Sequence, residues 1–273
     1  MFGQEQLIKR INKLIGDNLF PHFCIITGNS GSGKKTLVKE VIAPSLSAMV
    51  YPVETGIDSV RNLIREAYTI KNPMVYLIGD ADKLSTPAKN ALLKVTEEPP
   101  NDTYIIMTLQ DLNNTLDTIR SRSTVFIMEN YSRKELEGYY NSKTNYDEQE
   151  CNIILDLCEN PGEIDLLLGT GVKEFYDYVD LTVNNIAEVT GSNSFKIAGK
   201  ISLKQDAEGY DLKMFLKAFM SICIQRMFEN PSRYAVGVTI TSKFLQQLGI
   251  KGISKQMLID NWILEIRKSW NNF

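Results

Sequence analysis

Short apolar runs alternate with amphipathic segments along the first 130 residues of the chain. A short apolar run bounded by polar residues or Gly is typical of a buried strand, whereas apolar residues spaced three or four apart indicate a helix. Strands are predicted at Phe23–Thr27, Ala48–Val53, Met74–Ile78, Thr103–Met107 and Thr124–Met128. Helices are predicted between them, at Gln4–Ile15, Lys34–Val41, Ile57–Tyr68, Thr86–Val95 and Leu112–Ile119. This alternation predicts an α/β domain with a parallel sheet and helices on both faces.

The pattern changes from Ser132 onward, where only helical spacing remains. Helices are predicted at 132–142, 147–158, 163–168, 173–190, Leu212–Phe228, Ser232–Leu248 and Ser254–Trp270. The stretch 192–210 contains Gly, Ser, Asn and Asp and suits a linker. We therefore expect three domains: α/β over 1–130, a small helical domain over 131–190 and a helical C-terminal domain over 191–273. The apolar faces of the last helices suit either core packing or a partner surface.

Composition narrows the classes of function. The 273 residues carry a net charge of −3, so general affinity for nucleic acid is not expected, and any DNA contact needs a local patch or partner subunits. The four cysteines (Cys24, Cys151, Cys158 and Cys223) form no C-x-x-C pair and His22 is the only histidine, which argues against zinc. No apolar signal segment and no run of 18 apolar residues is present, so we expect a soluble, cytoplasmic protein without membrane contact.

A glycine-rich loop follows the first predicted strand and opens a helix. This context is what a phosphate-binding loop requires, because glycines let backbone N–H groups approach phosphate oxygens. Lys34 would reach the terminal phosphates of a nucleotide such as ATP or ADP. The alternative is a Gly-rich turn with a chance Lys. The candidate nucleotide-binding residues are Gly28, Asn29, Ser30, Gly31, Ser32, Gly33, Lys34, Lys35 and Thr36.

Two positions depart from a working Mg²⁺ site. Lys35 stands where a Ser or Thr normally holds the metal, and Thr36 is rotated from that position by about 100° around the helix. After the strand 74–78, Gly79 and Asp80 stand where such ATPases usually have Asp and then Glu. Asp80 is the candidate water-activating acid if the site is active, or else a solvated strand end. Asp82 is expected to cap the helix near Ser85.

One longer block resembles a known family. Ala88-Lys89-Asn90-Ala91-Leu92-Leu93-Lys94-Val95-Thr96-Glu97-Glu98-Pro99-Pro100 is similar to the A-x-N-A-L-L-K-x-x-E-E-P-P block of bacterial clamp-loader subunits, AAA+ proteins of the DNA polymerase III holoenzyme. Phe2–Glu5, His22 and Thr118–Ser123 resemble further blocks of that family. The resemblance covers residues 1–128, and more weakly extends to about 170. It implies an AAA+ P-loop domain, a small helical lid domain and a C-terminal collar domain that oligomerises.

The departures at Lys35 and Gly79 resemble the delta-prime type of subunit. In that type the arginine matching Arg122 points at a neighbouring subunit's ATP and acts in trans. The alternative for Arg122 is a surface side chain paired with an acid. Thr108 and Gln110 are the candidates for a residue that senses the γ-phosphate. The usual four-cysteine zinc module and the lid arginine are missing from this sequence, the latter from Asn160–Glu163.

The resemblance implies a subunit that helps load a sliding clamp onto primed DNA, together with other clamp-loader subunits. Lys83, Lys89 and Lys94 surround the block that would face DNA. We expect little or no ATPase activity from the chain alone. Two alternatives stay open: an active clamp-loader ATPase that uses Asp80, and a stand-alone ATP-binding regulator without a clamp.

Overall fold

The computed structural model describes residues 1–100, 102–186, 212–248, 250 and 254–271. It contains two compact units, Met1–Ser142 with Glu159–Glu163, and Lys143–Cys158 with Ile164–Phe273. The finer division into three domains stays a prediction. The expected linker at 192–210 lies outside the described residues.

A five-stranded parallel sheet forms the centre of the first unit. Its strands lie in the order β2-β3-β4-β1-β5. The central strands β1 and β3 are buried along their whole length, which is why their sequences are continuous apolar runs. The predicted parallel sheet is confirmed. The strands are β1 (Phe23–Thr27), β2 (Met49–Val53), β3 (Met74–Ile78), β4 (Thr103–Leu109) and β5 (Thr124–Ile127).

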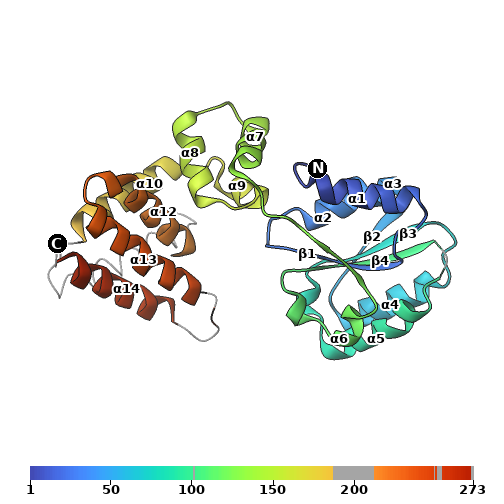
Figure 1. Ribbon diagram of the computed structural model, residues 1–273. Coiled ribbons are helices and arrows are strands. Elements are labelled where there is room, and N and C mark those ends of the chain that lie inside the picture. The colour runs from blue at the N-terminus through green and yellow to red at the C-terminus, as the bar shows by residue number, and fades with distance from the viewer. Residues whose placement is uncertain (101, 187–211, 249, 251–253, 272–273) are drawn as a thin grey trace. The chain divides into compact units, whose positions relative to one another are not determined.

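Helices cover both faces of this sheet (Figure 1). One face packs against α1 (Glu5–Gly16), α2 (Lys34–Leu37), the π-helical turn Val38–Ile42 and α3 (Ala43–Ser45). The other packs against α4 (Ile57–Ala67), α5 (Thr86–Glu97) and α6 (Asp117–Arg120). Successive β1 residues alternate between the two cores, with Cys24 and Ile26 in one and Phe23 and Ile25 in the other.

The expected single helix over Leu112–Ile119 is wrong. The chain forms a 3-10 turn at Leu112–Asn114 and then α6, with extended backbone at Thr115 and Leu116 between them. The Asp111 carboxylate accepts a hydrogen bond from Asn113 N–H and so stabilises the turn. A side chain that bonds to the backbone nearby competes with a continuous helix.

Helices make up the rest of the described chain: α7 (Arg133–Lys143), α8 (Glu148–Leu157), α9 (Pro161–Leu167), α10 (Val172–Asn185), α12 (Leu212–Gln225), α13 (Pro231–Gln247) and α14 (Lys255–Trp270). Short 3-10 turns lie at Ala81–Lys83 and Arg226–Phe228. Among the residues described, no helix has the length and apolar character needed to cross a membrane.

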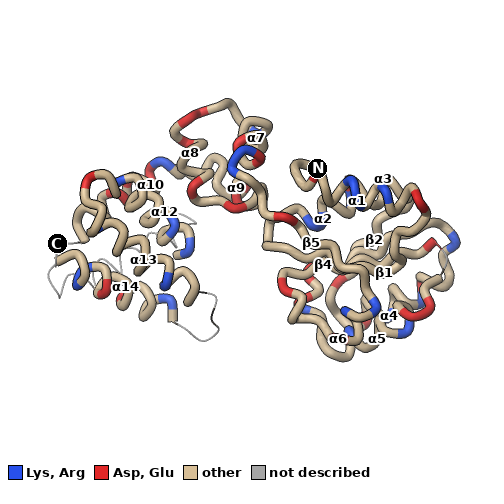
Figure 2. The backbone as a smooth tube through the Cα atoms, in the orientation of Figure 1, with Lys and Arg blue, Asp and Glu red and all other residues tan. Residues whose placement is uncertain are grey.

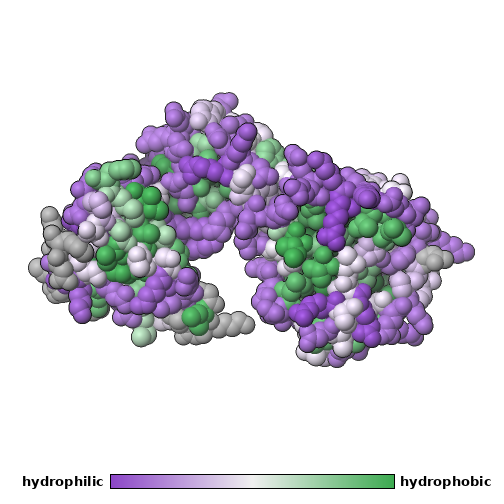
Figure 3. All heavy atoms as spheres, in the orientation of Figure 1, coloured by the Kyte–Doolittle hydropathy of each residue, from purple (hydrophilic) through white to green (hydrophobic). Residues whose placement is uncertain are grey.

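The core of the second unit forms around the indole of Trp262 on α14. The rings of Phe215 and Phe219, both on α12, meet it edge to face at centroid distances of 5.8 and 4.7 Å. Trp262 Nε1 donates a hydrogen bond to Thr241 Oγ1 on α13, and both side chains are fully buried. Most apolar residues of α12 and α14 therefore serve core packing, although apolar atoms also reach the described surface, as Figure 3 shows in green.

Candidate phosphate-binding site

The glycine-rich loop connects the end of β1 to the start of α2, as the spacing predicts. Gly31 and Gly33 adopt left-handed backbone conformations, with φ of 80° and 89°. Such conformations favour glycine because it lacks a Cβ atom. Gly28 N–H donates to the carbonyl of Leu109 at the end of β4, which fixes the start of the loop to the sheet. The strand, loop and helix thus have the arrangement of a phosphate-binding loop.

The Lys34 side chain folds back onto this loop. Its Nζ donates to the carbonyl oxygens of Gly28 and Asn29, at 2.6 and 2.7 Å. Burial lowers the pKa of Lys34, and the nearby carboxylates of Asp80 and Asp82 oppose that shift. Ser32 is also buried, and its Oγ has no hydrogen-bond partner in the described structure. The loop therefore contains the buried ammonium of Lys34 and, two residues earlier, the buried hydroxyl of Ser32, which has no hydrogen-bond partner in the described structure.

Lys35 lies against the end of β3. Its Nζ is 2.9 Å from Asp80 Oδ2. A Cβ atom added to Gly79 would lie 2.7 Å from Lys35 Cε and 3.1 Å from Lys35 Nζ. The hydrogen bond from Lys35 holds the pKa of Asp80 below its ordinary value, while partial burial opposes this. The space beside Gly79 is thus filled by the Lys35 side chain.

These residues do not fit the usual Mg²⁺ set of a P-loop NTPase. That set needs a Ser or Thr hydroxyl after the loop lysine and an Asp at the strand end. Here an ammonium and a glycine occupy these positions, and Thr36 is exposed on α2. Across the described residues, no group of three or more His, Cys, Asp or Glu side chains could hold a metal ion.

The four cysteines are buried, and none of them forms a disulfide within the described structure. Burial raises the pKa of Cys223 to about 12 and that of Cys24 still further. The thiols of Cys24 and Cys223 are therefore protonated and pack as small apolar groups.

Both sensor candidates lie at the end of β4. Thr108 is fully buried, and its Oγ1 accepts a hydrogen bond from Asp80 N–H. Gln110 is exposed, and its carbonyl accepts from Thr27 Oγ1 at 3.4 Å. The structure thus places Thr108 behind Asp80 and Gln110 beside the start of the loop. Their role towards a γ-phosphate stays a prediction.

The expectation that Asp82 caps a helix is wrong. Ser85 itself caps α5, because its side chain accepts a hydrogen bond from Ala88 N–H. The Asp82 carboxylate instead accepts from the backbone N–H groups of Gln110 and Asp111. Asp82 therefore holds the segment after β4 next to the end of β3.

The segment 159–163 also contacts the phosphate loop, and the sequence analysis did not predict this contact. Gly162 N–H donates to the carbonyl of Gly31 at 3.1 Å. A Cβ atom at Gly162 would lie only 2.6 Å from Gly31 Cα, so the two backbones touch. The Asn160 side chain is buried there, and its Nδ2 has no partner in the part of the chain described. The available signal was the Pro161-Gly162 pair, a turn dipeptide whose glycine permits close backbone approach.

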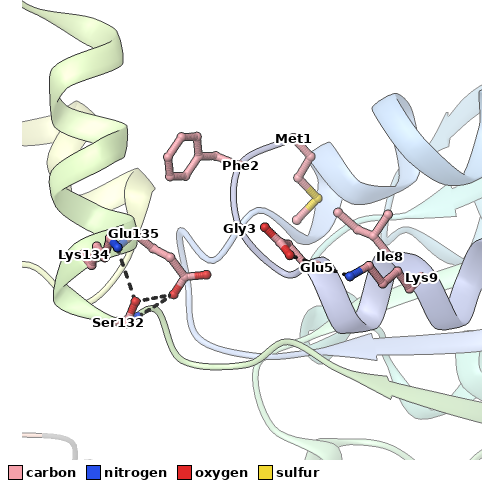
Figure 4. A pocket seen from close by; sticks show the side chains of 9 residues that line it. All are labelled: Met1, Phe2, Gly3, Glu5, Ile8, Lys9, Ser132, Lys134 and Glu135. Atoms are coloured by element: carbon pink, nitrogen blue, oxygen red, sulfur yellow. Dashed lines mark hydrogen bonds and ion pairs between the residues drawn. The ribbon is translucent and has the colours of Figure 1, made fainter.

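A pocket of about 540 Å³ lies between the first residues of the chain and the start of α7 (Figure 4). A Cβ atom at Gly33 would lie 3.5 Å from Met1 Cε, which places this pocket next to the phosphate loop. Glu135 accepts hydrogen bonds from the backbone N–H and hydroxyl of Ser132, and these hold the pKa of Glu135 low. The lining residues are Met1, Phe2, Gly3, Glu5, Ile8, Lys9, Ser132, Lys134 and Glu135.

Arg122 lies apart from these groups in sequence and is bound to an acid. Its Nε and Nη2 are 2.9 and 2.8 Å from Glu97 Oε1, at the end of α5. Its Nη1 donates to the Thr118 carbonyl at 3.0 Å. The side chain remains 40% exposed. The alternative stated above, an Arg122 side chain paired with an acid, is therefore present in the isolated chain. The Arg122 guanidinium is still accessible to solvent.

The three lysines considered for DNA contact differ in exposure. Lys83 and Lys94 are exposed. Lys89 is buried, and its Nζ donates to the carbonyl of Asn114. Lys89 is therefore not available to a DNA phosphate. Figure 2 shows Lys and Arg interspersed with Asp and Glu along the chain rather than gathered in one segment.

Comparison with known proteins gives a consistent group of relatives. Residues 53–132 match the family described as DNA polymerase III, delta subunit. DNA polymerase III subunit gamma of Buchnera aphidicola is 26% identical over 192 residues, covering 57% of this chain and 53% of that protein. A replication factor C small subunit of Sulfurisphaera tokodaii is 24% identical over 209 residues, covering 69% of this chain and 62% of that protein.

Structural comparison supports the fold. A DNA polymerase III gamma-subunit-related protein from Thermotoga maritima aligns with a TM-score of 0.54 at 15% identity, covering 97% of this chain and 99% of the other. The chain spans only about half to three fifths of the length of the two sequence relatives named above. Over part of its length, the chain is therefore similar to a DNA polymerase III gamma subunit and to replication factor C small subunits, and residues 53–132 match the DNA polymerase III delta-subunit family.

Proposed function

We propose that this chain is a non-motor clamp-loader subunit of the delta-prime type. It acts in the cytoplasm with other clamp-loader subunits to place a sliding clamp on primed DNA. Its own nucleotide site binds ATP or ADP without effective hydrolysis. The observation that carries this proposal is the pair Lys35 and Gly79, which replaces the hydroxyl and the carboxylate of the usual Mg²⁺ set.

The proposed catalytic contribution is Arg122, acting on a neighbouring subunit's ATP. An arginine placed against the transferring phosphoryl group stabilises the charge that develops on its oxygens. Glu97 and the Thr118 carbonyl hold the Arg122 guanidinium at the end of α5 while leaving it accessible. In the assembly, Arg122 would exchange its contact with Glu97 for the γ-phosphate of the neighbour.

The test is the ATPase activity of a complex reconstituted with motor subunits. Arg122→Ala and Arg122→Lys should slow hydrolysis at the adjacent motor site by about 10³-fold, as for other arginines supplied in trans. Arg120→Ala is the matched control, because Arg120 lies on α6 two residues earlier and is also exposed. Single-turnover kinetics with the other motor sites inactivated would isolate the site. Unchanged hydrolysis in the Arg122 variants would refute the trans role.

The second candidate function is an ATPase that hydrolyses ATP by itself, with Asp80 as the base. The low pKa of Asp80 favours an ionised carboxylate, as a base requires. Its ion pair with Lys35 opposes this function, because a carboxylate bound to an ammonium is a weaker base. Turnover by the purified chain, abolished by Lys34→Ala, would establish this candidate and refute the non-motor proposal. ATP binding by a chain that fails to assemble with the other clamp-loader subunits would favour the stand-alone regulator.

A further inference from the structure

The Lys35 side chain occupies the space that a side chain at position 79 would need, so the two departures from the usual site depend on each other. Gly79 does not have positive φ, so backbone conformation does not require glycine at this position. A Cβ atom at Gly79 would lie 2.7 Å from Lys35 Cε, so a larger residue at this position would force the flexible end of the Lys35 side chain to shift. The missing carboxylate therefore provides the space in which the Lys35 ammonium reaches Asp80.

The charge of the site is preserved by this exchange. In the usual set, one Lys and one Mg²⁺ face one Asp and one Glu, which leaves a single net positive charge. Here the Mg²⁺ and the first carboxylate are absent and the Lys35 ammonium is added, while Asp80 stays and Asp82 is a further carboxylate near Lys34. Losing a divalent cation and one carboxylate while gaining one ammonium is electrostatically neutral. The ammonium also lies beside the end of β3, as the metal ligands of that set do.

The buried loop groups are consistent with an anionic ligand. Ser32 is only 4% exposed, and its Oγ lacks a partner within the described chain. Lys34 Nζ donates hydrogen bonds to the neutral carbonyl oxygens of Gly28 and Asn29. Both are donors that a phosphate oxygen could accept from without breaking an ion pair.

From these observations we propose that Lys35 replaces the divalent cation of the phosphate site, so that this chain binds nucleotide polyphosphates without Mg²⁺. The inference rests on the proposed binding of nucleotide to the Gly28–Thr36 loop. It assigns Lys35 as a ligand-binding residue and Gly79 as the residue that leaves room for it. The ammonium of Lys35 supplies charge to the phosphates but no metal chemistry.

The experiment measures binding of ATP to the full-length chain by titration calorimetry, in excess Mg²⁺ and in excess EDTA at equal ionic strength. Wild-type affinity should agree within about twofold between the two conditions. Lys35→Met should weaken binding in EDTA by about tenfold or more, because a charge-assisted hydrogen bond is lost. Lys39→Met is the control, since Lys39 is exposed one helical turn further along the chain. Its affinity should match the wild type.

Two further variants test the pairing of Lys35 with Gly79. Gly79→Ala should displace the flexible end of Lys35 and weaken binding in EDTA without lowering the melting temperature. The double variant Lys35→Thr with Gly79→Asp restores the usual metal ligands and should make ATP binding depend on Mg²⁺.

Three outcomes would overturn the proposal: wild-type binding that requires Mg²⁺, equal binding by Lys35→Met in EDTA, or no ATP binding in either condition. The trans role of Arg122 would survive each of them, because it is measured at a neighbour's site.

Discussion

In the ion pair between Lys35 and Asp80, the Lys35 ammonium lowers the pKa of the Asp80 carboxyl. Both side chains are about half exposed, at 51% and 44%, so the pair is worth about 1 kcal/mol or less. The effect of this pair on the protonation of Asp80 is larger in consequence than its contribution to the free energy of unfolding. The Asp80 carboxylate stays ionised to lower pH than an ordinary aspartate because Lys35 donates to it.

Lys35→Met is therefore expected to raise the pKa of Asp80 towards its ordinary value. In the wild type the folded-state pKa of Asp80 is depressed, so the contribution of the Lys35–Asp80 pair to the free energy of unfolding is fully present above the unfolded-state pKa of about 3.9. It is lost as pH falls through the lower folded-state pKa. Carboxyl carbon shifts followed by NMR between neutral and acidic pH would measure this. An unchanged Asp80 titration in the variant would contradict the assigned cause.

The contact between Arg122 and Glu97 allows a second prediction at this scale. Glu97→Gln should lower the free energy of unfolding by about 1 kcal/mol or less, because the pair is exposed and Thr118 still binds the guanidinium. Denaturant unfolding monitored by circular dichroism would measure the change. If Glu97 only binds Arg122 before the subunits assemble, the reconstituted complex should retain its ATPase activity in this variant. A loss as large as that of Arg122→Ala would show that Glu97 is part of the site.

The phosphate loop is stabilised by elements that are distant in sequence. Gly28 N–H bonds to the end of β4, and Gly31 accepts from Gly162 at the start of α9. The backbones of Gly31 and Gly162 touch, so neither position has room for a Cβ atom. The loop conformation thus depends on the segment 159–163 as well as on β1 and α2.

Gly162→Ala should separate this segment from the loop. We expect a loss of about 1–3 kcal/mol in the free energy of unfolding, as for other overpacked positions. Gly16→Ala is the matched control, because Gly16 ends α1 with nothing within 4 Å of an added Cβ atom. Hydrogen exchange at the Gly28–Thr36 amides should increase in Gly162→Ala and not in the control. Equal stability of the two variants would contradict a tight contact.

The packing of α13 against α14 depends on the bond between Thr241 and Trp262. Thr241→Val keeps the shape of the side chain but leaves Trp262 Nε1 buried without an acceptor, which should cost about 1–3 kcal/mol. Thr239→Val removes an exposed hydroxyl from the same helix and should change stability by about 0.5 kcal/mol or less. Urea unfolding of both variants compares the two losses. Similar values would mean that the indole N–H finds another partner.

Over the whole molecule, local patterns predict the fold better than the site. The buried strands Phe23–Thr27 and Met74–Ile78 have the predicted bounds, because a strand covered on both faces is apolar throughout. The helix predicted over Leu112–Ile119 was wrong because its apolar spacing carried no information about the turn at Asp111.

The phosphate loop could be predicted from spacing, since its function resides in consecutive residues. The ion pair from Lys35 to Asp80 joins residues 45 positions apart, and Gly162 reaches Gly31 from still further along the chain. Such contacts depend on tertiary packing, which periodicity does not report. A glycine at position 79 was a signal for the first of them, but its meaning required the position of the Lys35 side chain.

Net charge gives the prediction that belongs to the molecule as a whole. The chain carries a charge of −3, and Lys89 is bound inside the first unit, so the described surface offers no concentrated positive segment there. Non-specific DNA binding depends on neutralising phosphates with Lys and Arg. The purified chain should therefore bind a primed template no more tightly than about 10⁻⁶ M at physiological salt. Fluorescence anisotropy over a salt series would measure both the affinity and the number of phosphates contacted. Nanomolar binding by the chain alone, weakened by Lys83→Ala or Lys94→Ala, would contradict this prediction, because these lysines would then form a DNA site without partner subunits.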